Sequence, residues 1–377
     1  MTAAVAAVVI LFLAVLTPAP AAAQADAAKT DPLAALTALD QRWQRHLDEP
    51  ASAPAGFDAA RAFIPLKDGG IVALALDDGA VSWRRDLSTP FTPAAGDGLV
   101  FVVSGSEVQA LDAVSGRTKW RAETGTAVAA PPYWDTGWLI ISTMDGTLLA
   151  YRAADGVEVW RQGLGTPLAV RPAPALDRLY LGLTDGRLVS ASLATGVTDW
   201  EYAVRGRMTG ILGLDDQVVI GSTENFLISL DPRTGRERWR WRLGGDPAGA
   251  PSADDDRIYV AALDNVLRAL DRRSGNLRWT RSLTARPGAS PLRVGNLLLV
   301  PYVSAEIGVF DPEAGTPAFV IAAAGEVGAR PYLRAGARPT AAQVFTLSRD
   351  GTIQGFAARF EPPPVALAEL PGKKVEP

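Results

Sequence analysis

The chain carries few of the side chains on which enzymes usually rely. It has no cysteine and one histidine, His46, among 377 residues. Disulfides, thiolate metal sites, a cysteine nucleophile and a lipid anchor attached through cysteine are therefore excluded. His46 has no companion ligand in the sequence, so we assign it no chemical role. These residues predict a protein that is not an enzyme and that holds no cofactor or metal.

A run of three carboxylates, Asp254 to Asp256, is the one sequence feature that suggests a cation site. Clustered carboxylates suit hard cations such as calcium. Short acidic turns, including Asp97-Gly98 and Asp215-Asp216, occupy the equivalent place elsewhere in the chain. The run is therefore interpreted as an ordinary solvated turn.

Two arginines offer the candidate binding chemistry. Arg171 and Arg330 each precede a proline and lie 159 residues apart. Guanidinium groups donate paired hydrogen bonds to carboxylate and phosphate oxygens. If the fold brings the two positions together, they form a site for an anion or an acidic peptide. The alternative is that each pairs with a nearby carboxylate or points into solvent, as most arginines do.

A repeat of about forty residues positions these arginines. Large aromatic residues recur at intervals of 37, 40, 40, 39, 40 and 40, and a glycine stands four residues before each. The aromatic residues are Trp83, Trp120, Trp160, Trp200, Trp239, Trp279 and Phe319. The glycines are Gly79, Gly116, Gly156, Gly196, Gly235, Gly275 and Gly315. We interpret the glycines as turn residues and the tryptophans as the side chains that dock neighbouring units together.

The pattern inside each unit predicts four short strands. An apolar run such as Leu99 to Val103 is followed by an alternating segment such as Val108 to Asp112, and turn residues separate the two. Eight such hairpins occur, and short segments rich in proline, alanine and glycine precede them. Four strands per forty residues are typical of a propeller blade. The fold class is therefore all-β, an eight-bladed β-propeller of four-stranded antiparallel blades over residues 57–360.

An eight-bladed ring places Arg171 and Arg330, four repeats apart, on opposite sides of its axis. The eighth unit, Gln343 to Phe360, has the hairpin but lacks the glycine and the tryptophan. Its outermost strand is either Val365 to Leu370 or a segment from the N-terminal side.

The two ends of the chain show different patterns. Residues 1–23 are almost wholly apolar and end in small residues, which predicts a signal peptide cleaved after Ala23, with an uncleaved membrane anchor as the alternative. Residues 24–56 are predicted to be a linker and one amphipathic helix, with Leu33, Leu36, Leu39, Trp43 and Leu47 at helical spacing. This helix either lies against the propeller or offers its apolar face to a partner. Residues 361–377 are predicted to be a proline-rich flexible tail.

The frame A-L-D-x-x-S/T-G-x-x-x-W, as in Ala110 to Trp120 and Ala269 to Trp279, resembles the tryptophan-docking repeat of pyrroloquinoline-quinone-type propellers. Two branches of that superfamily are relevant. Quinoprotein alcohol dehydrogenases are larger and carry an adjacent cysteine pair over a quinone. BamB-like subunits of the outer-membrane β-barrel assembly machinery match this chain in length and in their bare eight-blade layout. The chain differs from BamB in lacking a lipobox cysteine.

The resemblance implies a non-catalytic periplasmic scaffold that binds protein partners in the cell envelope, among them barrel-assembly components. The expected state is a monomeric subunit of a complex. The alternative is a propeller that binds a quinone or another small molecule, as a subunit or sensor of a redox system. A formal net charge of −4 gives no general attraction to phosphate backbones, so nucleic acid is not an expected partner.

Overall fold

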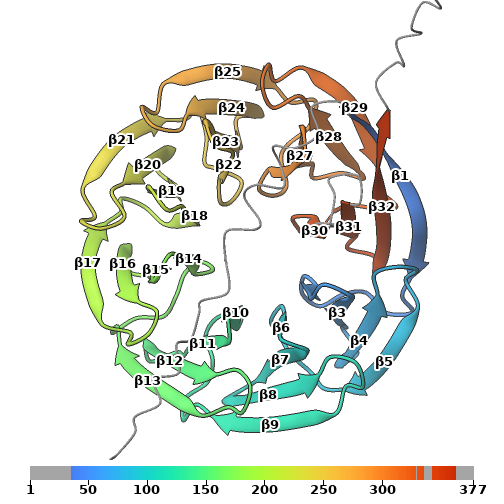
Figure 1. Ribbon diagram of the computed structural model, residues 1–377, viewed down its shortest axis with the longest axis vertical. Coiled ribbons are helices and arrows are strands. Elements are labelled where there is room, and N and C mark those ends of the chain that lie inside the picture. Colours follow the sequence, from blue (N-terminus) through green and yellow to red (C-terminus); the bar gives the residue numbers. More distant parts are fainter. Residues whose placement is uncertain (1–34, 328, 335–341, 362–377) are drawn as a thin grey trace, which may run out of the picture.

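The computed structural model describes residues 35–327, 329–334 and 342–361, and every regular element in these ranges is a β-strand. The strands form eight sheets of four antiparallel strands each, arranged as a ring (Figure 1). The predicted eight-bladed β-propeller is thereby confirmed. Within the described ranges, no helix has the length and apolar character needed to cross a membrane.

Each blade consists of four strands, taken from the axis outward. The first four blades contain β2 (Gly56–Phe57), β3 (Arg61–Pro65), β4 (Gly70–Ala75) and β5 (Val81–Asp86); β6 (Ala94–Gly96), β7 (Leu99–Ser104), β8 (Glu107–Asp112) and β9 (Thr118–Glu123); β10 (Tyr133–Asp135), β11 (Trp138–Ser142), β12 (Thr147–Arg152) and β13 (Glu158–Gly163); and β14 (Ala173–Ala175), β15 (Arg178–Gly182), β16 (Arg187–Ser192) and β17 (Thr198–Ala203).

The next three blades follow the same order. They contain β18 (Met208–Gly213), β19 (Val218–Ser222), β20 (Phe226–Leu230) and β21 (Glu237–Arg242); β22 (Ser252–Ala253), β23 (Arg257–Ala262), β24 (Val266–Asp271) and β25 (Leu277–Ser282); and β26 (Leu292–Val294), β27 (Leu297–Pro301), β28 (Glu306–Phe310) and β29 (Pro317–Ala322). The eighth blade contains β30 (Tyr332–Arg334), β31 (Gln343–Leu347), β32 (Thr352–Glu361) and β1 (Ala35–His46).

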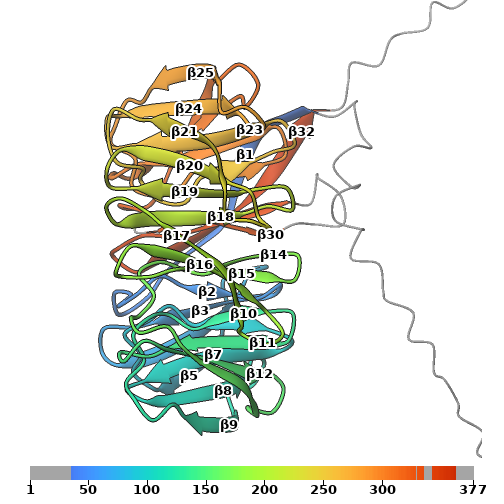
Figure 2. The same ribbon diagram turned by 90° about the vertical axis from the view of Figure 1, so that its left-hand side faces the viewer.

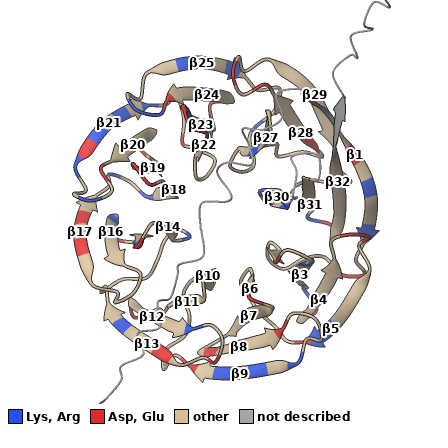
Figure 3. Ribbon diagram, viewed as in Figure 1, with Lys and Arg blue, Asp and Glu red and all other residues tan. Residues whose placement is uncertain are grey.

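Burial explains why the strands of one blade differ in sequence. The second strand β7 is almost wholly buried and reads as a continuous apolar run, because neighbouring blades cover both of its faces. The outermost strand β9 alternates between half-buried and exposed residues, since only one face meets the adjacent blade. Figure 3 shows residues of both charge signs along the outermost strand β21. Charges of this kind protect exposed strand edges from pairing with other chains.

The hydrophobic core lies between blades rather than within them. Phe101 and Val103 of β7 pack against Leu139 and Ile141 of β11 in the next blade, and equivalent clusters fill the other blade interfaces. Each of these four side chains is 0% exposed. Apolar burial of this kind is the main force that holds the ring closed.

The tryptophans lie at the same blade interfaces. Seven of them dock one blade to the next: the indole N–H of each donates a hydrogen bond of 2.9–3.4 Å to a backbone carbonyl of the following blade. The pairs are Trp43 with Leu76, Trp83 with Ala113, Trp120 with Ala153, Trp160 with Leu193, Trp200 with Pro232, Trp239 with Arg272, and Trp279 with Pro312. The ring of each also packs over the turn glycine of that blade.

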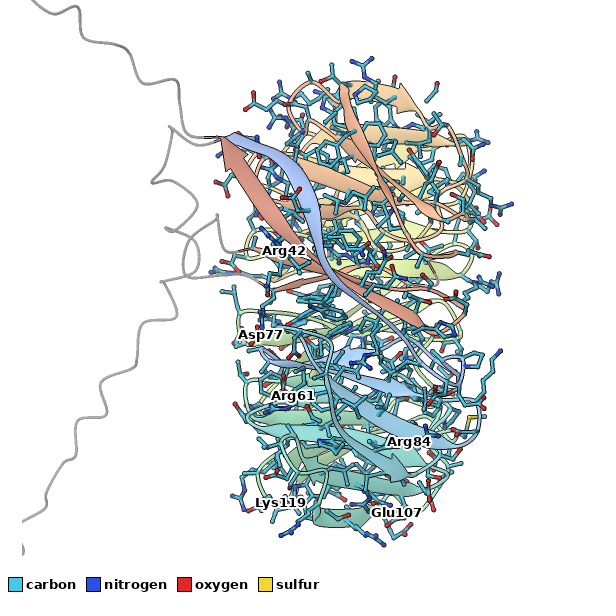
Figure 4. All side chains as sticks on the ribbon, turned by 90° about the vertical axis from the view of Figure 1, so that its right-hand side faces the viewer. Arg42, Arg61, Asp77, Arg84, Glu107 and Lys119 are labelled. Carbon is cyan, nitrogen blue, oxygen red and sulfur yellow. The ribbon has the colours of Figure 1, made fainter. Side chains whose placement is uncertain are left out.

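The predicted amphipathic helix is wrong for Ala35–His46, which form the strand β1. β1 pairs antiparallel with β32 along its whole length and supplies the outermost strand of the eighth blade (Figure 4). Leu39, Trp43 and Leu47 are four residues apart, and this spacing suits a strand face as well as a helical stripe. The free edge of β32 decides between the two, because a strand there satisfies its backbone groups.

The N-terminal side therefore completes the eighth blade, and the ring begins at Ala35 rather than at residue 57. Trp43 is its docking tryptophan, located 40 residues before Trp83. The inner ends of the first and last blades also meet, since the rings of Phe57 and Tyr332 stack at 4.2 Å. The predicted signal peptide, the segment Val365 to Leu370 and the predicted tail from residue 362 onward lie outside the described residues.

The turn aspartates make the stability of the fold dependent on pH. Asp231 accepts hydrogen bonds from the backbone and hydroxyl of Thr234 and pairs with Arg238 at 2.7 Å. The bonds from Arg238 and Thr234 lower the pKa of Asp231 to about 2. The ionised carboxylate therefore stabilises the fold above the pKa of the unfolded chain, about 3.9, and this contribution is lost as the pH falls toward about 2.

Asp231→Asn should lower the free energy of unfolding by about 1 kcal/mol at neutral pH, because the charged pair with Arg238 is lost. The difference from the parent protein should shrink as the pH falls below about 4. Urea unfolding at neutral pH and at about pH 3 measures both values. Asp311→Asn is the control, since Asp311 accepts only the two backbone bonds. A deficit for Asp231→Asn that stays constant with pH would contradict this account.

Candidate functional site

The two faces of the ring are built from different loops. The connectors between blades lie beside the turns between second and third strands, as the 2.8 Å bond from Met144 N–H to the Ala127 carbonyl shows. We call this side the connector face. The remaining turns form the opposite face, where Ala113 N–H donates to the Gly98 carbonyl at 2.8 Å. The first residue of β1, Ala35, pairs with the last residue of β32, Glu361, and this end of the two strands also lies at the opposite face, on the right of Figure 2.

The innermost strands of the eight blades surround a central channel (Figure 1). Arg171 lies two residues before β14, and Arg330 lies two residues before β30. β14 and β30 belong to blades four apart and face each other across the ring. The structure therefore brings the two arginines to opposite walls of the same channel.

Neither guanidinium has a partner among the described residues that would neutralise its charge. No ion pair or hydrogen bond joins Arg171 or Arg330 to any described side chain, and both side chains are exposed to solvent in the channel. Confinement by the surrounding blades lowers the pKa of Arg330, and the positive charge of Arg171 lowers it further. The two cations thus lie within electrostatic range of each other.

A tyrosine of the neighbouring blade positions Arg171. The guanidinium carbon lies 5.2 Å from the centroid of the Tyr133 ring, at the start of β10. A cation over an aromatic face is held by the ring quadrupole. Asp135, on the same strand as Tyr133, influences Arg171 electrostatically but forms no ion pair with it. Burial raises the pKa of Asp135, while Arg171 partly opposes that rise.

The connector face carries a hollow of about 330 Å³ between the fifth, sixth and seventh blades. Leu263 and Val303 hold equivalent turn positions in adjacent blades, border this hollow and are 37% and 48% exposed. Arg286 and Thr209 also line it, and the Thr209 hydroxyl is buried without a hydrogen-bond partner. This part of the face combines exposed apolar groups with one cation.

A second hollow, of about 270 Å³, lies on the same face where the first and last blades meet. It is lined by backbone and side chains of both blades, including the basic residues Lys67 and Arg349. Both hollows therefore open on the connector face.

The expectation of a solvated turn at Asp254 to Asp256 is wrong for Asp254. Asp255 and Asp256 are exposed, but the Asp254 side chain is only 17% exposed. It accepts hydrogen bonds from the Tyr259 hydroxyl at 2.5 Å and from Arg293 of the next blade at 2.7 Å. These donors lower its pKa against the opposing effect of burial. Asp254 links blades, and the described residues contain no cluster of three or more residues suited to hold a metal.

Some of these features leave a signal in the sequence and others do not. The offset of four repeats placed Arg171 opposite Arg330. Tyr133 could not be foreseen, because its contact with Arg171 joins two different blades. The exposed residues Leu263 and Val303 leave a weak signal: both stand immediately before the turn between the second and third strands, where the equivalent residues Lys67, Thr184 and Arg349 are polar and Met144 is apolar and exposed.

Comparison with solved structures shows the fold. The crystal structure of BamB from Moraxella catarrhalis superposes with a TM-score of 0.67 at 17% identity, over 85% of this chain and 100% of that one. The quinohemoprotein alcohol dehydrogenase ADHIIG from Pseudomonas putida HK5 has the same TM-score at 14% identity, over 85% of this chain and 76% of that one. Sqt1 from Saccharomyces cerevisiae superposes with a TM-score of 0.72 at 10% identity, over 85% of this chain and 99% of that one. No curated protein sequence matches the chain.

Comparison of the sequence with family models is more specific. One model, described as outer membrane protein assembly factor BamB, matches residues 33–128, 67–213 and 206–319. These overlapping matches run from β1 into the last strand of the seventh blade, and together they cover well over half of the chain. The protein thus belongs to the family described as outer membrane protein assembly factor BamB.

Proposed function

We propose that this protein is a non-catalytic scaffold of the cell envelope that binds partner proteins at its connector face. Membership of the BamB family supports this role, as does the absence from the sequence of the cysteine pair that marks the quinoprotein dehydrogenases. The proposed partners are proteins of outer-membrane β-barrel assembly. The predicted export signal in residues 1–23 would bring the chain to the periplasm.

The observation that carries the proposal is the pair Leu263 and Val303 beside the 330 Å³ hollow. Two exposed aliphatic groups next to a recess are a typical anchor point for a partner side chain. The strands beneath them are packed into the core, since Val260 and Val300 are buried between blades. Variable turns on a fixed framework are the usual way in which propellers bind partners.

Leu263→Asp combined with Val303→Asp should remove this anchor without unfolding the ring, because both side chains are exposed. We expect crosslinked partner recovered from the intact envelope to fall by about tenfold or more, as for loss of an interface hot spot. Affinity purification of the tagged full-length protein after crosslinking measures this. A recovered set that lacks β-barrel assembly proteins would argue against the specific partner.

Val81→Asp combined with Val197→Asp is the matched control. These two valines are 52% and 59% exposed and follow turns of the opposite face, so the change in charge and apolar area is similar. Equal losses in the two double variants would overturn the assignment of the connector face. The alternative role in quinone binding is tested separately: a change in the absorbance of added pyrroloquinoline quinone would favour the redox role over the scaffold.

A further inference from the structure

The arginine pair in the channel has uncompensated charge. Arg171 and Arg330 reach the axis from opposite blades, and neither has a carboxylate partner among the described side chains. Two like charges in a channel walled by protein repel each other more strongly than they would in bulk water. The lowered pKa of Arg330 reflects this confinement and the nearby charge of Arg171. An anion between the two would relieve the repulsion.

The surroundings leave the hydrogen-bond donors of the pair free. The guanidinium carbon of Arg171 lies 5.2 Å from the centroid of the Tyr133 ring, and this cation–π contact takes up no hydrogen-bond acceptor. No described side chain accepts a hydrogen bond from Arg171, so its N–H groups stay available to an external acceptor. Asp135 influences Arg171 from the neighbouring strand but forms no ion pair with it. The N–H donors of Arg171 are therefore not taken up by this carboxylate.

The other blades place small side chains at the equivalent position of the channel wall. The residues that precede the inner-strand prolines in other blades include Thr92, Ala250 and Ser290. None of these carries a charge, so the pair supplies the positive potential there. Paired N–H donors from two sides match an anion with several oxygen atoms better than they match chloride.

We propose that Arg171 and Arg330 together form an axial site for one oxyanion, a carboxylate or phosphate group held between opposite blades. The group belongs either to a small molecule in solution or to an acidic side chain of a polypeptide. The site does not depend on the scaffold role, since it lies in the channel and not among the residues of the connector-face anchor. Failure of either proposal leaves the other intact.

The test compares anion binding by the full-length protein and by Arg171→Ala/Arg330→Ala. Calorimetric titration at fixed ionic strength uses three probes: inorganic phosphate, citrate and a tetraglutamate peptide. We expect the double variant to bind the preferred probe about tenfold or more weakly than the parent protein. Phosphate or citrate as the preferred probe indicates a small-molecule source, and the peptide indicates a polypeptide source. Absence of binding by all three probes, or binding that the double variant retains, overturns the site.

The melting temperature with and without anion gives a second readout, because a purely structural role of the arginines would not make the anion response depend on them. Without added anion, Arg330→Ala should melt no lower than the parent protein, because it removes repulsion from Arg171. With saturating anion the parent protein should melt higher, by mass action, and the variant should not. Arg205→Ala/Arg207→Ala is the control. These two arginines are also exposed, but they lie in the connector before β18 and are not part of the axial pair, so their removal should leave the response to anion unchanged. An anion-induced rise in Arg330→Ala equal to that of the parent overturns the proposal.

Discussion

Deletion of residues 35–47, which form β1 and the start of its connector, is expected to abolish cooperative unfolding of the ring. β1 supplies the outermost strand of the eighth blade and pairs with β32 over ten residue positions. Its loss removes Trp43 and Leu47 from the interface with the first blade. Burial of each side chain contributes about 2–5 kcal/mol, and whole domains are stable by only about 5–15 kcal/mol. The strand therefore accounts for a large part of the total stability.

The deletion should also expose the backbone groups of β32 as a free edge, which promotes association between chains. Thermal unfolding followed by circular dichroism and light scattering measures both effects. Trp43→Ala is the graded comparison, because it keeps the strand and removes one docking side chain. A synthetic peptide of residues 35–48 added to the deleted chain should restore part of the transition. A deletion variant that unfolds cooperatively at the parent temperature would show that the ring does not need β1.

The fold could be predicted from the sequence because one blade is a short-range unit. Each blade interior is set by turn residues and alternating strands within forty residues, so Trp120, Gly156 and their equivalents identify the period and the register. Closure of the ring is a contact between the two ends of the chain. Trp43 has the forty-residue interval to Trp83, but it has no glycine four residues before it. The repeat pattern therefore did not identify β1 as part of a blade.

The candidate site could be predicted only in outline. Counting repeats placed Arg171 opposite Arg330, because the eight-fold ring converts an offset in sequence into a position in space. The contact of Arg171 with Tyr133 and the link from Asp254 to Arg293 join separate blades. Such contacts depend on how neighbouring sheets are inclined and on which rotamers fit. Neither is encoded in the local pattern.

The second large effect is expected at the docking tryptophans. Trp239 is 9% exposed, its N–H bonds to the Arg272 carbonyl at 3.4 Å, and its ring lies over Gly275 of the next blade. Trp239→Ala should lower the free energy of unfolding by about 3–5 kcal/mol, because it empties a large buried volume between two blades. Trp239→Phe should cost less, since the ring is kept and one weak hydrogen bond is lost. Urea unfolding of the three proteins measures both values.

A double-mutant cycle tests whether the indole and the glycine act as one unit. A β-carbon at Gly275 would lie 2.6 Å from the Trp239 ring, and the φ angle there is +72°. Gly275→Ala should therefore cost about 1 kcal/mol for the left-handed backbone, plus the displacement of the indole. Gly137 has a φ of +85° with nothing near its would-be β-carbon, so Gly137→Ala should show the backbone cost alone. In the Trp239→Ala background the cost of Gly275→Ala should fall to that of Gly137→Ala, because the ring it displaces is gone. Strictly additive effects of the two substitutions would mean that the indole does not rest on this glycine in solution.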